Sequence, residues 1–356
     1  MQFDMAADIH DEQITMLRRL AKSDDFPHIL LYGPSGAGKR TLIKCLLKEL
    51  YQSPYVSKVK CELKEFKTGA SGSTTVECIV YSSNYHIEVT PSDADNNDKV
   101  IVQKLIKEVA SSQQLDTKTQ KTFKVIVIHE MDKLTKAAQA ALRRTMETYM
   151  PFCRIVAHCE SLSKIIPPIK SRCLQVRVPA PSDTQVVGIL SKIAAKEQFE
   201  LPEKLAADIS VYARRNLRIA IMMLQTAKLK HPGKSLPEKT YVPCREFESY
   251  AKSIAKDTIA EQSPRQLKNI RPKLYDLLTK GIAPELIFQV LVREFLRPSA
   301  GGSKMGGCLV EHIKPEVLNY ACIFEQRCYD GSKSIMHLEA FLARVMALQK
   351  KALTGA

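Results

Sequence analysis

One glycine-rich segment constrains this chain more than any other feature of its sequence. It reads Gly33-Pro-Ser-Gly-Ala-Gly38-Lys39, follows an apolar run at 28–32 and precedes a segment with helical spacing at 41–50. A strand, a G-x-x-x-x-G-K loop and a helix in this order form a phosphate-binding loop. Its glycines let backbone N–H groups face phosphate oxygens, and its lysine adds a positive charge. We therefore predict that this loop binds a nucleotide.

Short apolar runs alternate with helical patterns through the first half of the chain. Strands are predicted at 28–32, 85–89, 124–128, 154–158 and 173–178, with helices at 41–50, 100–110 and 136–149. Strands that alternate with helices form a parallel sheet, and continuous apolar strands agree with helices on both faces of that sheet. We therefore predict an α/β domain over residues 1–180, with a hairpin tip at 71–75.

Only helical patterns follow this domain. A small helical domain is predicted at 181–232 and an all-α domain at 233–356. Residues 231–237 include two prolines and a glycine, as is typical of a linker. Residues 298–307 include four glycines and are predicted to form a flexible surface loop, for which the sequence suggests no function.

The residues that normally bind the magnesium ion of a nucleotide depart from their usual pattern. The loop lysine is usually followed by Ser or Thr, whose hydroxyl binds Mg²⁺. Here Arg40 follows, and Thr41 lies about 100° further round the helix. The strand at 124–128 should be followed by an Asp that reaches the same ion, but His129 stands there, and Mg²⁺ prefers oxygen ligands. We predict that this site binds no ordinary Mg²⁺ and hydrolyses nucleotide weakly or not at all.

Two charged side chains bear on this degenerate site. Our hypothesis is that the Arg40 guanidinium replaces part of the metal's charge near the β-phosphate, so that nucleotide binds without metal. Glu130 follows the strand as a degenerate catalytic acid that could polarise a water molecule, although any charged residue at a strand end has the same appearance.

Three further motifs follow the phosphate loop. They are Ala140-Ala-Leu-Arg-Arg-Thr-Met-Glu147, Ser163-Lys-Ile-Ile-Pro-Pro-Ile-Lys-Ser-Arg-Cys173 and Arg215-Asn-Leu-Arg-Ile-Ala220. Together with the loop they resemble the AAA+ clamp-loader family, in particular the small subunits of eukaryotic replication factor C. The segments at 26–30, 92–94 and 337–341 are similar to the third of those small subunits. The resemblance extends over nearly the whole chain.

The resemblance implies an AAA+ P-loop domain, a helical lid and a helical collar that joins different subunits into a hetero-pentamer. That complex loads the PCNA sliding clamp onto primer–template DNA in replication and repair, which implies a nuclear location. Arg172 matches the arginine finger that acts in trans on a neighbour's ATP, and Arg218 matches the lid arginine that contacts the chain's own ATP or ADP. The predicted nucleotide-binding residues are Gly33, Pro34, Ser35, Gly36, Ala37, Gly38, Lys39, Arg40, Thr41 and Arg218.

The chain departs from the family at two further positions that concern the nucleotide. It begins Met1-Gln-Phe-Asp-Met-Ala6 and lacks the V-D-K-Y-R-P-like segment that helps to enclose adenine, although Glu12-Gln13 matches the family's residues just after that segment. The family's Asn near the γ-phosphate is replaced by Glu160, whose carboxylate repels a phosphate unless Arg40 pairs with it. The first difference weakens adenine binding and the second argues against hydrolysis.

Basic residues of two predicted helices are candidates for contacts with partners. By the resemblance, Lys99, Lys104 and Lys107 lie where the ring faces DNA and would follow phosphates without reading bases, although a solvated helix face has the same pattern. Arg143 and Arg144 are expected to couple the ATP site either to a neighbouring subunit or to the side that faces DNA.

The charge balance agrees with a polyanionic partner. Lys and Arg number 53 against 38 Asp and Glu, a net charge of +15 that is spread along the chain. A spread surplus favours a site made by the fold, or by several chains, over a basic tail. The ten cysteines form no C-x-x-C pair, and no apolar run reaches the roughly 18 residues of a membrane-spanning helix. We expect buried, reduced thiols, no structural metal and no membrane partner.

Two alternative functions belong to other classes. An autonomous P-loop ATPase, such as a helicase or a nucleotide kinase, needs the metal ligands that Arg40 and His129 replace. A scaffold subunit that binds no nucleotide agrees with the altered start of the chain but not with the intact loop at 33–39. Nucleotide titration and turnover of the purified chain distinguish these alternatives.

Overall fold

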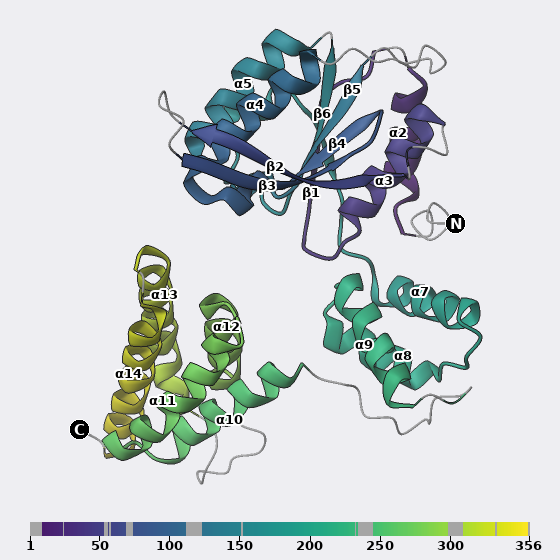
Figure 1. Cartoon of the computed structure of the whole chain (residues 1–356). Helices are drawn as coiled ribbons and strands as arrows, with labels where there is room; N and C mark the ends of the chain where they lie inside the picture. The colour runs from purple at the N-terminus through teal and green to yellow at the C-terminus, as the bar shows by residue number, and fades with distance from the viewer. Residues whose placement is uncertain are drawn as a thin grey trace. The chain divides into compact units, whose positions relative to one another are not determined.

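The computed structural model describes residues 9–354, except 24, 53–55, 57, 69–73, 112–122, 151, 232, 234–244, 298–308 and 332. The chain forms two compact units, residues 1–242 and 243–356 (Figure 1). The first unit combines the two domains predicted at 1–180 and 181–232. The surface loop predicted at 298–307 and most of the linker predicted at 231–237 lie outside the described residues.

A seven-stranded sheet forms the centre of the first unit. Its strands are β1 (Ile29–Tyr32), β2 (Lys60–Thr68), β3 (Thr74–Ser82), β4 (His86–Val89), β5 (Lys124–Ile128), β6 (Cys153–Cys159) and β7 (Leu174–Arg177). In the order β2-β3-β4-β5-β6-β1-β7, every pair from β4 to β7 is parallel. The carboxyl ends of these strands therefore lie along one edge, where parallel sheets bind their ligands.

The sheet is parallel only in part, because β2 and β3 form an antiparallel hairpin at its edge. A hairpin tip is predicted at 71–75 without its two nine-residue strands, and the last two residues of that segment belong to β3. Phe66 and Val80 are buried on one face of the hairpin, whereas Leu63 and Ile79 are exposed on the other. Burial of one face alone removes the continuous apolar pattern that predicts the central strands.

Helices cover both faces of the sheet (Figure 1). They are α2 (Asp11–Lys22), α3 (Lys39–Tyr51), α4 (Asp98–Ser111) and α5 (Lys136–Tyr149), with the short turns η2 (Pro91–Asn97), η3 (Met131–Lys133) and α6 (Pro167–Lys170). Because side chains alternate along a strand, Leu30 packs with α4 and α5 while Leu31 packs with α2 and α3. The loop that joins β1 to α3 thus lies at the carboxyl edge of the sheet.

Three helices beyond the sheet form a small core of their own. They are α7 (Asp183–Lys196), α8 (Glu203–Ala213) and α9 (Leu217–Lys230). Ser182 and Gln185 form a capping box that begins α7. The Asn216 side chain begins α9 by accepting a 3.2 Å hydrogen bond from the Ile219 N–H. Ile9, from the start of the described chain, packs against this core.

The second unit is a helical bundle in the part of the chain that the structure describes. Its elements are α10 (Glu246–Ala260), α11 (Pro264–Thr279), α12 (Pro284–Phe295), η4 (Glu311–Ile313), α13 (Lys314–Asp330) and α14 (Ser334–Thr354). Phe341 lies at its centre, with the rings of Phe288, Phe295 and Phe324 at 5.3, 6.1 and 6.5 Å. Within the described residues, none of the helices combines the length and apolar character that a membrane crossing requires.

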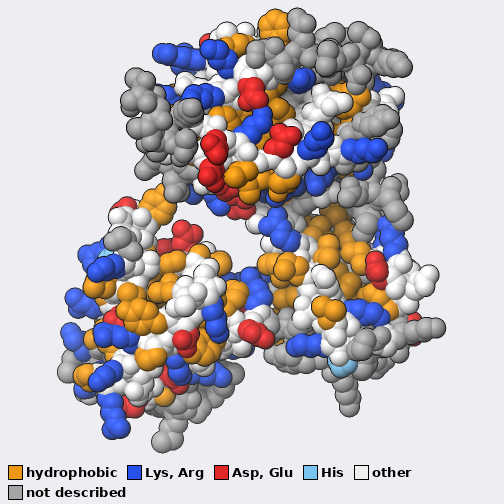
Figure 2. All heavy atoms as spheres, viewed as in Figure 1, with side chains coloured by type: hydrophobic (Ala, Val, Ile, Leu, Met, Phe, Trp, Pro, Cys, Tyr) orange, Lys and Arg blue, Asp and Glu red, His pale blue; other side chains and the backbone are white. Residues whose placement is uncertain are grey.

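Two features of composition can be compared with the structure. Lys and Arg side chains are scattered over the face shown in Figure 2, in agreement with the spread of charge in the sequence.

The eight described cysteines are all free, and Cys45, Cys78, Cys153 and Cys159 are buried, whereas Cys61 and Cys322 are exposed. The expectation of reduced thiols therefore agrees with the described residues, but their burial is incomplete.

His28 links the stability of the sheet to pH. Its buried Nδ1 accepts a 3.0 Å hydrogen bond from the Ile155 N–H, and burial, with the charge of Arg154, lowers its pKa to about 4. In the unfolded chain His28 has its ordinary pKa of about 6.5 and is protonated first as the pH falls. The free energy of unfolding is therefore unaffected by His28 above about pH 6.5 and decreases as the pH drops towards 4. His28→Asn keeps a hydrogen-bond acceptor but does not titrate. We expect its free energy of unfolding to decrease between pH 7.5 and 4.5 by on the order of 3 kcal/mol less than that of the wild type. Urea unfolding at pH 7.5 and 4.5 tests this, and equal pH losses in both proteins would contradict it.

Candidate nucleotide-binding site

The loop between β1 and α3 has a backbone that favours glycine at three of its positions. A Cβ on Gly33 would lie 2.0 Å from the backbone oxygen of Val178, and a Cβ on Gly36 would lie 1.8 Å from the Asn216 Oδ1. Gly36 and Gly38 have φ values of +72° and +96°, in the left-handed region that side chains disfavour. The glycine spacing seen in the sequence is therefore required by this conformation.

Lys39 is the first residue of α3 and lies beneath this loop. Only 7% of it is exposed, and its Nζ donates hydrogen bonds of 2.6 and 2.9 Å to the backbone oxygens of Gly33 and Pro34. Burial lowers the pKa of Lys39, although Glu160 and Asp132 act in the opposite direction. Among the described residues, no carboxylate bonds to this ammonium group. A buried cation surrounded by loop carbonyls fits an anionic ligand such as a nucleotide phosphate.

Two segments outside the sheet, one before β1 and one at the start of α9, form hydrogen bonds with backbone oxygens of the loop. The N–H of Leu217, at the start of α9, donates a 3.2 Å hydrogen bond to the Gly36 oxygen. The buried His10 forms a 2.9 Å hydrogen bond through Nε2 with the Ala37 oxygen. Arg218 lies close enough to Lys39 for its charge to lower the lysine pKa. The structure therefore brings the predicted Arg218 to the phosphate loop, and it adds His10 and Asn216, which are not among the predicted site residues.

The position of the expected metal ligands holds nitrogen groups. Arg40 and Thr41 are both exposed on the first turn of α3. His129 directly follows β5, is 3% exposed, and places its Nε2 3.0 Å from the Glu88 Oε2 on β4. Within the described chain, no group of three or more His, Cys, Asp or Glu side chains is arranged to hold a metal ion. The nitrogen groups of Arg40 and His129 do not fit Mg²⁺, which prefers oxygen ligands in octahedral geometry.

The acidic residues near this position are engaged elsewhere. Glu130 has a left-handed backbone, with φ of +52°, and its carboxylate forms a 2.7 Å ion pair with Lys133. The Asp132 Oδ2 accepts a 3.3 Å hydrogen bond from the backbone N–H of Glu160. The hypothesis that Arg40 neutralises Glu160 gains no support, since the described residues include no ion pair between them.

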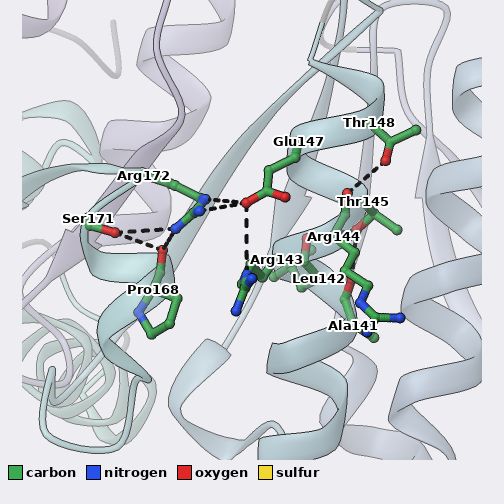
Figure 3. A network of polar contacts seen from close by, with 10 residues as sticks. All are labelled: Ala141, Leu142, Arg143, Arg144, Thr145, Glu147, Thr148, Pro168, Ser171 and Arg172. Atoms are coloured by element: carbon green, nitrogen blue, oxygen red, sulfur yellow. Dashed lines mark hydrogen bonds and ion pairs between the residues drawn. The ribbon is translucent and has the colours of Figure 1, made fainter.

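Arg172 lies on a different part of the first unit, where α6 leads into β7 (Figure 3). Its Nε donates a 2.8 Å hydrogen bond to the Glu147 Oε1 on α5, and a second guanidinium nitrogen lies 2.5 Å from the same oxygen. A third nitrogen donates to the Pro168 backbone oxygen at 2.8 Å. About a third of the side chain is exposed. The guanidinium is thus held in one orientation while part of it stays open to a partner.

The other predicted basic residues fall into two groups. Arg143 shares the Glu147 carboxylate with Arg172 at 3.8 Å, whereas Arg144 points away from this pair (Figure 3). Lys99, Lys104 and Lys107 are exposed on α4 and point away from its buried side. Their positions span an arc of about 140° at 100° per residue, so they form a broad basic face rather than one row.

Comparisons with known proteins agree with this architecture. The chain is 44% identical to replication factor C subunit 3 of Homo sapiens over 97% of this chain and 92% of that protein. The chain belongs to the family of replication factor C small subunits. It is also 43% identical to a probable replication factor C subunit 3 of Dictyostelium discoideum (97% and 95% covered) and 40% identical to replication factor C subunit 5 of Schizosaccharomyces pombe (95% and 92% covered).

Family models match each part of this replication factor C subunit. Residues 9–182 match the DNA polymerase III delta subunit, residues 188–229 match the RCF1/5-like AAA+ ATPase lid domain, and residues 247–353 match the C-terminal domain of replication factor C subunit 3. RuvB of Thermotoga maritima has a similar fold, with a TM-score of 0.50 at 15% identity over 86% of this chain and 93% of that one. The predicted AAA+ fold, followed by an all-helical domain, is confirmed.

Three buried polar residues of this replication factor C subunit are not among the predicted site residues. Glu88 lies on β4 and His158 on β6, within strands selected only for their apolar character. His10 precedes α2 and reaches the loop across 27 residues of sequence. One signal was available, since His86-Ile-Glu-Val89 places two polar residues on the same side of a buried strand.

Proposed function

We propose that this chain is a nucleotide-binding small subunit of the replication factor C complex, a hetero-pentamer that loads the PCNA clamp onto primer–template DNA in nuclear replication and repair. One observation carries the proposal: a complete phosphate loop occurs beside metal-ligand positions that have been replaced, on a chain similar to these subunits over 97% of its length. The chain binds ATP or ADP, contributes little hydrolysis, and completes the ATP site of a neighbour.

Weak hydrolysis follows from three side chains. Arg40 and His129 stand where hydroxyl and carboxylate ligands of Mg²⁺ would be needed, and Glu160 brings negative charge towards Lys39. Glu130, the remaining candidate acid, is paired with Lys133. In this proposal Arg40 supplies positive charge to the phosphates, and the loop and Arg218 bind the rest of the triphosphate or diphosphate.

Contacts with partners are assigned to separate surfaces. The exposed part of Arg172 completes a neighbouring subunit's ATP site, and Arg143 is tied to this finger through Glu147. The basic face of Lys99, Lys104 and Lys107 follows the DNA backbone, in agreement with the net positive charge. The helical second unit joins the subunits into a ring, as the resemblance implies.

Nucleotide binding depends on Lys39 if this proposal is right. We expect Lys39→Ala to weaken ADP binding by about 10- to 100-fold, because a charged hydrogen bond contributes about 1.5–3 kcal/mol. Lys44→Ala removes an exposed lysine from the same helix and should leave affinity unchanged. Calorimetric titration of both variants makes the comparison, and equal affinities would count against the loop as the binding site.

The most direct test of the whole proposal is co-purification. Co-expressed with the other replication factor C subunits, the chain should enter a stable complex and carry bound ADP or ATP that mass spectrometry identifies. Brisk Mg²⁺-dependent turnover by the isolated chain would favour an autonomous P-loop ATPase instead. Assembly with no bound or titratable nucleotide would favour a scaffold subunit.

A further inference from the structure

Two histidines stand side by side at the carboxyl edge of the sheet. His129 follows β5, His158 lies on the adjacent β6, and their ring centroids are 5.0 Å apart. They are 3% and 6% exposed. Three of their four ring nitrogens have no hydrogen-bond partner in the described structure: the Nδ1 of His129 and both nitrogens of His158. Buried polar atoms without partners are costly, so this arrangement needs an explanation.

Glu88 is the third member of this cluster. It is 6% exposed, and its described ion pairs are with histidines alone: His129 at 3.0 Å and His86 at 3.5 Å. Lys44 and Lys48 line an adjoining cavity of about 230 Å³ with Glu88, but neither pairs with it among the described contacts. Burial raises the pKa of the Glu88 carboxyl, but the hydrogen bonds and charges of His129 and His86 outweigh burial and leave it well below its ordinary value.

A buried carboxylate that stays ionised needs a positive partner. His158 cannot supply one, because burial and the charges of His129, Lys39 and Arg40 lower its pKa to about 3. His86 lies farther from the carboxylate than His129 and bonds to the Ser83 hydroxyl at 2.7 Å through Nδ1. Of the two histidines that contact the Glu88 carboxylate, His129 is therefore the nearer one, and its other ring nitrogen has no partner in the described structure.

The remaining nitrogen of His129, Nδ1, has no partner within the described residues. Because Nε2 is bonded to Glu88, an imidazolium leaves Nδ1–H as a buried donor without a partner. The adjacent His158 ring lies within electrostatic range of Lys39, Arg40 and Arg218, which are the cations of the phosphate site. His129 also occupies the position that follows the central strand, where an acid would normally reach Mg²⁺.

We propose that His129, held as an imidazolium by Glu88, donates a hydrogen bond from Nδ1 to a phosphate oxygen of the bound nucleotide and takes the place of Mg²⁺. This inference rests on the proposed binding of ADP or ATP to this loop. It explains two features together: a carboxylate buried against histidines, and a metal position without oxygen ligands. Arg40 then adds charge from the exposed side of the site, and His129 adds it from the buried side.

The test measures ADP affinity of the full-length chain by calorimetry, with Mg²⁺ and with EDTA. Wild-type protein should bind equally well in both. Glu88→Gln keeps the shape but removes the charge, and His129→Gln removes the imidazolium, so each should weaken binding in EDTA by about 10- to 100-fold, as expected for a charged hydrogen bond. His158→Gln is the matched comparison, and it should change affinity by less than about threefold because its ring is neutral.

A second measurement does not depend on the variants folding. In wild-type protein with ¹⁵N-labelled histidine and bound ADP, both ring nitrogens of His129 should show the chemical shifts of a protonated imidazolium at pH 7.5. A neutral His129 ring in this spectrum would overturn the proposal. A thermal melt of each variant checks that a lower affinity does not come from unfolding.

The outcomes separate this inference from the proposed function. Equal binding by wild type, Glu88→Gln and His129→Gln in EDTA would overturn the role of the pair and leave nucleotide binding intact. Binding that appears only with Mg²⁺ would overturn it as well. If His129→Gln and His158→Gln lost ADP affinity equally, both rings would contribute only through packing, and the proposed role of His129 would be wrong. A chain that binds no ADP under any condition would remove the proposed function itself.

Discussion

Replacing Arg172 by alanine is expected to lower ATP turnover at the neighbouring subunit's site in the assembled complex by about 10³-fold. A finger supplied in trans stabilises charge that develops on the γ-phosphate, and a planar guanidinium suits this because it donates several parallel hydrogen bonds. ADP binding to this chain should not change, because Arg172 precedes the start of β7, and β7 begins beside the start of β1, at the end of that strand remote from the loop. Single-turnover hydrolysis in the reconstituted complex gives the rate, and calorimetry gives the affinity.

Two controls show whether the guanidinium itself is needed. Arg177→Ala removes an exposed arginine from the end of β7 and should leave turnover unchanged. Arg172→Lys keeps the charge but loses the fork, so it should recover only a small part of the rate. If Arg172→Ala hydrolyses ATP at the wild-type rate in a correctly assembled complex, the finger is assigned to the wrong residue.

The central fold could be predicted from the sequence because its signals are local and redundant. β5 was predicted with its observed bounds, since four consecutive β-branched residues, Val125–Ile128, can be buried only between two layers of helices. α5 was also predicted with its observed bounds, and Thr135 supplies its N-cap. The edge hairpin was not predicted as strands, because pairing between Leu63 and Ile79 leaves both side chains exposed and the apolar pattern incomplete.

The candidate site also contains residues that the sequence predicts and residues that it does not. Gly33, Gly36 and Lys39 occur within one heptapeptide, so spacing alone identifies them. The cluster of Glu88 and His129 joins residues 41 positions apart and becomes visible only when β4 and β5 lie side by side. The sequence indicates that His129 replaces a metal ligand, but it cannot indicate that a carboxylate on the next strand gives that histidine a charge.

The positive charges that make up the net charge of +15 lie at several separate sites and do not form one binding face. Lys39 is buried in the phosphate loop and Arg218 lies near it, whereas Arg172 is tied to Glu147 on another surface. In a proposed ring subunit, this spread is expected, because no single chain must surround the DNA. Each subunit then contributes a modest basic face, and affinity for phosphates comes from the assembled set.

Gly36→Ala is expected to weaken ADP binding by about 100- to 1000-fold. Its Cβ would lie 1.8 Å from the Asn216 Oδ1, and the backbone already has a φ of +72°. The free variant relaxes out of this conformation, so binding must restore it, at a cost of about 1–2 kcal/mol for the left-handed backbone and about 1 kcal/mol for the disturbed α9 cap, and displacement of Arg218 adds about 1.5 kcal/mol or more. Together these give about 4 kcal/mol, or about 10³-fold at 1.4 kcal/mol per factor of ten. Calorimetric titration of ADP measures the change.

A second substitution shows whether the clash with α9 is the cause. Gly36→Ala combined with Asn216→Gly removes the obstructing side chain, so affinity should recover in part, while the backbone strain and the missing cap persist. Gly188→Ala is the matched control, since its Cβ would meet nothing within 4 Å and alanine favours the α7 helix. Wild-type affinity in Gly36→Ala would mean that the loop moves freely away from α9, and the lid would then have no part in binding the nucleotide.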